Sequence, residues 1–211
     1  MSVSAEHVCR QANINDVADV ARIHLAAFPG FFLSTLGFRF LCVMYRAFML
    51  NKACVFVVSQ NSEGYLTGFA VGALQTGDRD RLLALKFLPQ FVLAVLPALL
   101  RHPLVVARRL AARFFEVGES PKIPESAVML RSIGVMPEVR GGGAAALLLE
   151  SFEQLAFARG AEQVFLTTDE EDNERAQRFY QRHGYVMSSR FCQDGKRWMW
   201  LMNKLNLDMP Q

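Results

Sequence analysis

The sequence predicts an α/β (α+β) domain with a mixed central sheet of about six to seven strands and helices on its faces. Three observations support this prediction. The 211 residues fit one domain, 1–211, rather than several. Stretches rich in β-branched and aromatic residues alternate with stretches of helical apolar spacing. A glycine-rich segment lies between a strand pattern and a helix pattern late in the chain.

The composition excludes several classes of protein. Hydrophobic residues make up 52% of the chain and charged residues 20%, which excludes intrinsic disorder. The net charge of +3 is too small to predict a nucleic-acid partner. The four cysteines are irregularly spaced, so we expect reduced thiols in a cytoplasmic protein and no metal, with a disulfide as the open alternative. The first eleven residues lack the apolar core of a signal peptide.

The N-terminal part predicts two helices and three strands. In order, the patterns indicate a strand over 8–12, a helix over 16–28 with Asn13 and Asn15 as caps, a helix over 35–50 with Ser34 as cap, and a hairpin of strands 53–60 and 65–74. Pro29 and Gly30 end the first helix. His24 falls on the apolar face of that helix.

Residues 75–120 differ in character and predict a helical, basic and apolar insertion. We expect two or three short helices separated by Pro89, Pro97 and Pro103. The apolar stretch 87–100 is too short to span a bilayer, which takes about 20 apolar residues. A helix lying on a membrane surface remains open. Between residues 78 and 113 seven basic residues face two acidic ones, a net charge of +5 that leaves −2 for the remainder.

The C-terminal part gives the sharpest pattern. It predicts a strand over 126–136, a glycine-rich loop over 137–143, a helix over 144–159, a strand over 162–168, a helix over 173–183, and a final hairpin of strands 185–191 and 196–202. Glycines in the loop allow the backbone to turn tightly and to approach a ligand. The free N–H groups and the dipole of the following helix favour a phosphate, and Arg140 adds positive charge. A plain turn before a core helix is the alternative.

Two other phosphate loops do not fit this segment. It lacks the Gly-Lys-Ser/Thr ending of a nucleoside triphosphate loop, and its glycines are not spaced as in a dinucleotide fingerprint. The run LRSIGVMPEVRGGGAAALL, followed by DNERAQRFYQRHGY, instead resembles the acetyl-CoA-binding core of the GNAT superfamily of N-acetyltransferases. Arg140, Gly143 and Ala145 match the family's Gln/Arg-x-x-Gly-x-Gly/Ala pattern, whereas a frame two residues earlier would place Glu138 at its first position. The resemblance implies a GNAT fold with an acetyl-CoA core over 126–185.

The resemblance also implies roles for individual residues. The strand ending at Val135 would separate from its neighbour at a bulge, and the backbone of Ile133 and Val135 would bind the pantetheine arm. The Val135 N–H would polarise the thioester carbonyl. Tyr180 would donate a proton to the leaving thiolate, with core packing as its alternative role. Asn173 would contact the cofactor or only cap a helix. The cofactor's phosphates would be held by the loop and the first helical turn, Arg140, Gly141, Gly142, Gly143, Ala144 and Ala145.

The base that takes the proton of the amine is not identified by the sequence. His24 is one candidate base or acceptor contact, although a hydrogen-bonded core histidine is the alternative that we favour. A water chain could do the same work. The other candidates are Glu125, Ser132, Asp169 and Glu170.

We therefore expect an acetyl-CoA-dependent N-acetyltransferase acting on a primary amine of a small molecule. Residues 24–41 are similar to a bacterial GNAT subgroup associated with cell-surface polysaccharides, which suggests an amino sugar. Protein or peptide amines remain open as acceptors. A non-catalytic acyl-CoA-binding or membrane-associated module on the same fold also remains open, as do a homodimer and a contact of 78–113 with the inner face of the membrane.

Overall fold

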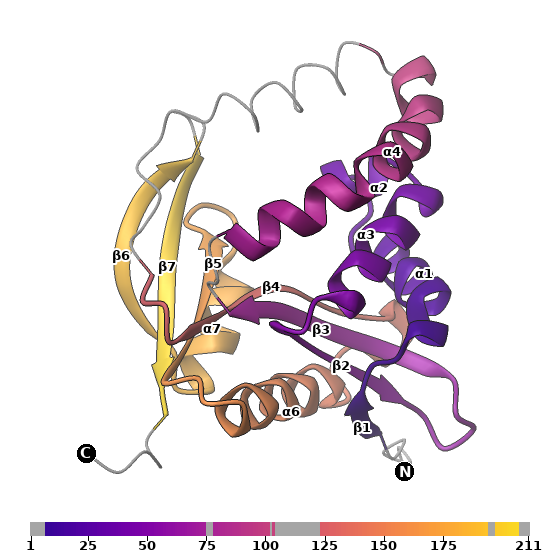
Figure 1. Ribbon diagram of the computed structural model, residues 1–211. Coiled ribbons are helices and arrows are strands. Elements are labelled where there is room, and N and C mark those ends of the chain that lie inside the picture. Colours follow the sequence, from indigo (N-terminus) through magenta and orange to yellow (C-terminus); the bar gives the residue numbers. More distant parts are fainter. Residues whose placement is uncertain (1–6, 75–77, 102, 104–122, 194–196, 207–211) are drawn as a thin grey trace.

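The computed structural model describes residues 7–74, 78–101, 103, 123–193 and 197–206 (Figure 1). Its seven-stranded sheet has the order β1-β2-β3-β4-β5-β7-β6. β4 and β5 pair in parallel, and the other neighbouring strands of this sheet pair antiparallel. The predicted mixed sheet flanked by helices is confirmed.

The boundaries of the elements lie close to the predicted ones. The strands are β1 Val8–Gln11, β2 Cys54–Gln60, β3 Leu66–Leu74, β4 Ala127–Val135, β5 Gln163–Asp169, β6 Val186–Gln193 and β7 Arg197–Leu205. The helices are η1 Ile14–Asp16, α1 Val17–Ala27, α2 Phe32–Thr35, α3 Phe38–Leu50, α4 Asp78–Arg101, η2 Pro137–Val139, α6 Ala144–Ala158 and α7 Glu174–Arg182.

The sheet is the middle of three layers. Val55 and Val57 of β2 pack into one core cluster with α6, whereas Phe56 and Val58 pack into a second cluster with α1 and α3. Successive residues of a strand point to opposite faces, so a strand covered on both sides must be apolar throughout. This explains why β2 is an unbroken apolar run rather than an alternating one.

The predicted helix over 35–50 is wrong at its beginning. The chain forms the short α2, and then α3 begins only at Phe38. Gly37 separates the two because its φ of +88° does not belong to a right-handed helix. Ser34, the predicted cap, lies inside α2, and its hydroxyl donates to the Phe28 carbonyl at 2.7 Å.

The prediction of short helices in the insertion is also wrong for residues 78–101. These residues form the single helix α4, which contains Pro89 and Pro97. Both prolines are exposed, so solvent can reach carbonyl groups that lose an N–H donor to them. Figure 1 shows α4 outside the sheet layers, where it packs against α3. The remaining part of the predicted insertion, 104–120, lies outside the described residues.

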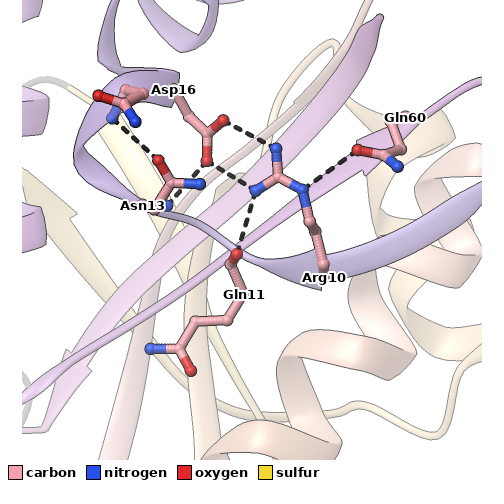
Figure 2. Close-up of polar contacts among 6 residues, drawn as sticks. Arg10, Gln11, Asn13, Asp16 and Gln60 are labelled. Atoms are coloured by element: carbon pink, nitrogen blue, oxygen red, sulfur yellow. Dashed lines mark hydrogen bonds and ion pairs between the residues drawn. The ribbon is translucent and has the colours of Figure 1, made fainter. Parts of the chain in front are cut away.

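A polar cluster fixes the start of α1 to the edge of the sheet (Figure 2). The Arg10 guanidinium of β1 donates to both Asp16 carboxylate oxygens at 2.8 Å and to the Gln60 side chain of β2 at 3.1 Å. Burial alone would raise the pKa of Asp16, but hydrogen bonds from Arg10 and the Asn13 N–H hold it below its usual value. Asn13 caps η1 rather than the predicted helix itself: the N-cap position of α1 is Asp16, and Asn15 lies within η1.

Candidate active site

A gap opens in the sheet where β4 and β5 separate. Their parallel pairing ends at Leu130 and Leu166, although β4 continues to Val135 and β5 to Asp169. The pairing of β3 with β4 shifts by one residue at the same level, so that Arg131 is an extra residue in β4. Such a bulge bends the strand that carries it. The expected separation of the strand ending at Val135 is therefore present.

The backbone of β4 presents polar groups to this gap. The Met136 N–H donates to the Thr67 carbonyl of the β3 segment at 2.8 Å. Directions of N–H and C=O groups alternate along a strand, so Gly134 faces β3 in the same way. The N–H and C=O groups of Ile133 and Val135 consequently point away from β3 and toward the separated β5. These are donors and acceptors suited to an extended amide-containing chain.

The glycine-rich loop lies at the end of the same strand. Gly141 and Gly143 have φ of +87° and +85°, which side-chain-bearing residues rarely adopt. All three glycines are exposed, and α6 begins at Ala144 directly after them. The first turn of an α-helix has N–H groups without an intrahelical acceptor, and its dipole favours an anion. This geometry suits a phosphate or pyrophosphate.

Arg140 joins the loop to the other side of the sheet. Its guanidinium donates to the Ala27 carbonyl, in the last turn of α1, at 3.0 Å. The side chain is exposed. A cation at the C-terminal end of a helix is favourable, so this contact holds the loop against α1. The structure thus gives Arg140 a positioning contact in addition to its place beside the glycines.

Tyr180 of α7 lies on the α6 side of the sheet. It packs against the same core cluster as Ile133 and Val135, with its ring 5.7 Å from that of Tyr185. Burial raises the pKa of Tyr180 to about 12. No described residue forms a hydrogen bond with its hydroxyl. The phenol therefore keeps its proton at neutral pH and remains available as a donor.

Asn173 does not cap α7 through its side chain. Its amide instead donates to the Thr168 hydroxyl at 2.6 Å, while its carbonyl accepts from the N–H of Gln177 at 3.1 Å. Thr168 is buried in β5. Asn173 therefore ties the start of α7, and with it Tyr180, to the β5 side of the gap.

The acidic residues after β5 are paired with arginines. Asp169 binds Arg197 through both carboxylate oxygens, and Glu170 binds Arg190 at 2.8 Å. Both carboxylates are therefore engaged by guanidinium groups rather than directed freely into the gap. Of the other base candidates, Glu125 is exposed and Ser132 is half-buried.

His24 lies on the opposite face of the sheet from Tyr180, where it is 3% exposed. Its Nδ1 is 2.6 Å from the Tyr45 hydroxyl, and the Ser132 side chain of β4 lies near that hydroxyl. Its Nε2 is buried and has no hydrogen-bond partner among the described residues. Burial lowers the pKa of His24 to about 4, so the imidazole is neutral at physiological pH.

The structure thus brings together some of the predicted residues and separates others. Ile133 and Val135 border the gap on the β4 side, with the loop at the end of that strand, and Tyr180 packs against the same core cluster as these two residues. His24 lies on the opposite face of the sheet. Tyr45 itself was missed by sequence reasoning. The sequence does place Tyr45 on the apolar face of a helix. A buried tyrosine hydroxyl usually forms a hydrogen bond, so this position could have indicated a polar contact in the core.

Comparison with known proteins agrees with this geometry. Residues 105–185 match the model of the acetyltransferase (GNAT) family. A solved acetyltransferase is 20% identical, over 94% of this chain and 98% of that one, with a TM-score of 0.59. The ribosomal-protein-S18-alanine N-acetyltransferase from Escherichia coli is 12% identical, over 98% and 100% of the chains, with a TM-score of 0.57. No curated protein matches the chain in sequence.

A further structural neighbour is the PaiA N-acetyltransferase from Thermoplasma acidophilum in complex with coenzyme A. It is 11% identical over 95% of this chain and 99% of that one, with a TM-score of 0.58. These neighbours share the fold, and the family match covers the loop, α6, β5 and α7. The chain therefore has the fold of the GNAT acetyltransferases, and its residues 105–185 match the model of that family.

Proposed function

We propose that the protein transfers an acetyl group from acetyl-CoA to the primary amine of a small molecule. The observation that carries this proposal is the gap between β4 and β5, with the Ile133 and Val135 backbone groups on one side and the glycine-rich loop at its end. Acetyl-CoA carries its acetyl group on an extended, amide-containing arm that ends at a pyrophosphate. It therefore needs backbone hydrogen-bonding groups along the arm and an anion site beyond them. The residues present therefore fit acetyl-CoA.

Each part of the site has a separate task in the proposal. The exposed glycines and the N–H groups of Ala144 and Ala145 hold the phosphates, with Arg140 fixing the loop. Ile133 and Val135 orient the pantetheine arm through backbone hydrogen bonds. When bound, acetyl-CoA supplies an electrophilic carbonyl carbon and a thiolate leaving group. The Val135 N–H stabilises negative charge that develops on the carbonyl oxygen.

Tyr180 is the proposed general acid. It stays protonated because burial raises its pKa to about 12, and its hydroxyl has no described partner that would compete. It gives its proton to the departing sulfur. Asn173 is a positioning residue in this scheme, because its contact with Thr168 fixes the start of the helix that carries Tyr180.

The proton of the amine leaves to solvent in this proposal rather than to a side chain. Asp169 and Glu170 are paired with arginines, and His24 is buried and neutral. We assign His24 a positioning role, because its Nδ1 is within hydrogen-bond distance of the Tyr45 hydroxyl, which lies near Ser132 on the strand that borders the gap. An amino sugar is the acceptor class that we would test first, because residues 24–41 are similar to a subgroup associated with cell-surface polysaccharides. This segment forms the last turn of α1, α2 and the start of α3.

Release of free thiol from acetyl-CoA, measured over a panel of amino sugars, polyamines and peptides, tests the proposal. We expect release that depends on one acceptor class. Tyr180→Phe should lower kcat by about 100-fold or more, the usual contribution of a general acid, with little change in acetyl-CoA binding. No release with any amine, while acetyl-CoA still binds, would favour the non-catalytic module.

Tyr185→Phe is the matched control for this substitution. Tyr185 is a neighbouring buried tyrosine, and its hydroxyl lies beside Glu153, which together with burial raises its pKa. Removing that hydroxyl should change stability more than kcat. Equal losses of kcat in both variants would show that packing in this cluster, rather than proton donation by Tyr180, controls the rate.

A further inference from the structure

Helix α4 has two apolar sides, of which the described residues cover only one. Phe87, Ala94 and Ala98 are buried, and Phe91 packs against Phe40 of α3 with ring centroids 5.4 Å apart. These residues recur at helical spacing and form the inner side. The inner side therefore accounts for the attachment of α4 to α2 and α3.

The outer side of α4 consists of large apolar residues that face solvent. We call it the outer apolar face of α4 and define it by six residues with their exposed fractions: Leu88 49%, Val92 55%, Leu93 67%, Leu96 43%, Leu99 36% and Leu100 83%. Gln90 is the single polar residue between positions 87 and 100. A surface helix normally carries polar residues on its solvent side, so a contiguous apolar face marks an interaction surface.

Charge indicates what this face binds. Lys86 is exposed just before it. In the sequence Arg101 follows it, and the segment 78–113, whose other charged side chains lie outside the described part of the structure, has a net charge of +5. A second copy would bring the same positive charge to the interface, which opposes self-association. An anionic lipid surface offers both an apolar interior for the leucines and negative headgroups for the flanking cations.

The helix lies on such a surface rather than crossing it. Among the described helices, none is long and apolar enough to span a bilayer. Pro89 and Pro97 are both exposed along α4, and the inner side is occupied by α3, so only one side can enter lipid. We propose that the outer apolar face of α4 docks the enzyme on an anionic membrane surface, with α2 and α3 held close to that surface.

Co-sedimentation of the full chain with vesicles tests this proposal. We expect binding to vesicles of phosphatidylcholine with about one third phosphatidylglycerol, weaker binding to phosphatidylcholine alone, and loss of binding with rising salt. The double substitution Leu93→Glu and Leu100→Glu should weaken binding at least tenfold. Leu205→Glu, at a residue of β7 that is 53% exposed, is the matched control and should bind like the unchanged chain.

The other occupants of this face give different results. If the unchanged chain does not sediment with anionic vesicles, the proposal is wrong. A dimer that the α4 double substitution dissociates would assign the face to a second copy. A large loss of unfolding free energy in that variant, without vesicle binding by the parent, would assign it to another segment of the chain. Thiol release with a soluble amine should be unchanged in the variant, so failure here is distinct from failure of the proposed activity.

Discussion

The burial of His24 could be predicted from the sequence, whereas its hydrogen-bond partner could not. The helical spacing places it on the apolar face of α1, and this could be predicted. Its contact with Tyr45, which is 21 residues further along, depends on how α1 and α3 pack and could not be predicted from spacing. Sequence reasoning therefore found the buried histidine but not its contact with Tyr45, whose hydroxyl lies near Ser132.

Burial of His24 predicts acid destabilisation. Its pKa of about 4 in the folded chain lies below the ordinary value of 6.5. Above that ordinary value the imidazole is neutral in both states and the shift costs nothing. Between about pH 6.5 and pH 4 the unfolded chain binds a proton that the folded chain refuses, so the free energy of unfolding falls as pH falls, by up to about 3 kcal/mol.

Urea unfolding of His24→Gln over this pH range measures the effect. The variant should lose the part of the pH dependence that belongs to His24, because glutamine does not titrate. Tyr45→Phe is the control, since it removes the hydrogen-bond partner and leaves the imidazole in place. That variant should be less stable but keep the slope, whereas identical slopes in His24→Gln and the parent would contradict the prediction.

At the scale of elements, the gap between β4 and β5 depends on register. The sequence predicts both strands within one or two residues of their observed ends, because each is a clear apolar run. It does not reveal that Arg131 is an extra residue in the pairing with β3, since a bulge has no fixed side-chain signature. The separation of the strands was expected from family resemblance, and the register explains how this chain achieves it.

Gly72 is predicted to be essential for this register. A Cβ at position 72 would press on the Met129 carbonyl oxygen and lie 2.6 Å from the Phe152 ring. The carbonyl belongs to the paired strand β4 beside the bulge and cannot move aside as a side chain could. Gly72→Ala should therefore cost about 3 kcal/mol of unfolding free energy or prevent folding, as overpacking of a core does.

Gly64→Ala is a control for this substitution. Gly64 lies in the exposed turn between β2 and β3, and a Cβ there would meet nothing within 4 Å. Its φ of +85° leaves only backbone strain, of about 1 kcal/mol. Urea unfolding of both variants separates the two effects. A Gly72→Ala protein as stable as the Gly64→Ala protein would mean that β3 and β4 can move apart at the bulge.

For the whole molecule, the sequence predicted the class of fold correctly but not the secondary structure of residues 78–101 in the insertion. Seven strands, the loop and the core helices follow from local patterns that agree with one another. The continuous helix α4 does not follow from such local patterns, because its two prolines predict breaks. Prolines in a helix are tolerated only where solvent or neighbouring groups satisfy the carbonyls that lose an N–H donor. Whether residues 78–101 form one helix or several therefore depends on packing and solvent exposure, which the sequence pattern does not show.

Binding of acetyl-CoA should stabilise the entire fold, because the proposed site uses β4, the loop, α6 and α7 together. A ligand at 100 times its Kd adds about 2.7 kcal/mol to the free energy of unfolding. For a chain of this size that corresponds to a rise in Tm of roughly 5–10 °C. Thermal unfolding with acetyl-CoA, and with free acetate as a ligand control, measures it.

Ala145→Asp provides the discriminating variant for this measurement. A carboxylate in the first turn of α6 favours the helix through its dipole, so the Tm without ligand should not fall. The same charge repels the phosphates of acetyl-CoA, so most of the ligand-induced rise should disappear. A full rise in this variant would place the phosphates elsewhere than at the start of α6. Absence of a rise in the unchanged chain at millimolar acetyl-CoA would count against both the enzyme and the acyl-CoA-binding module.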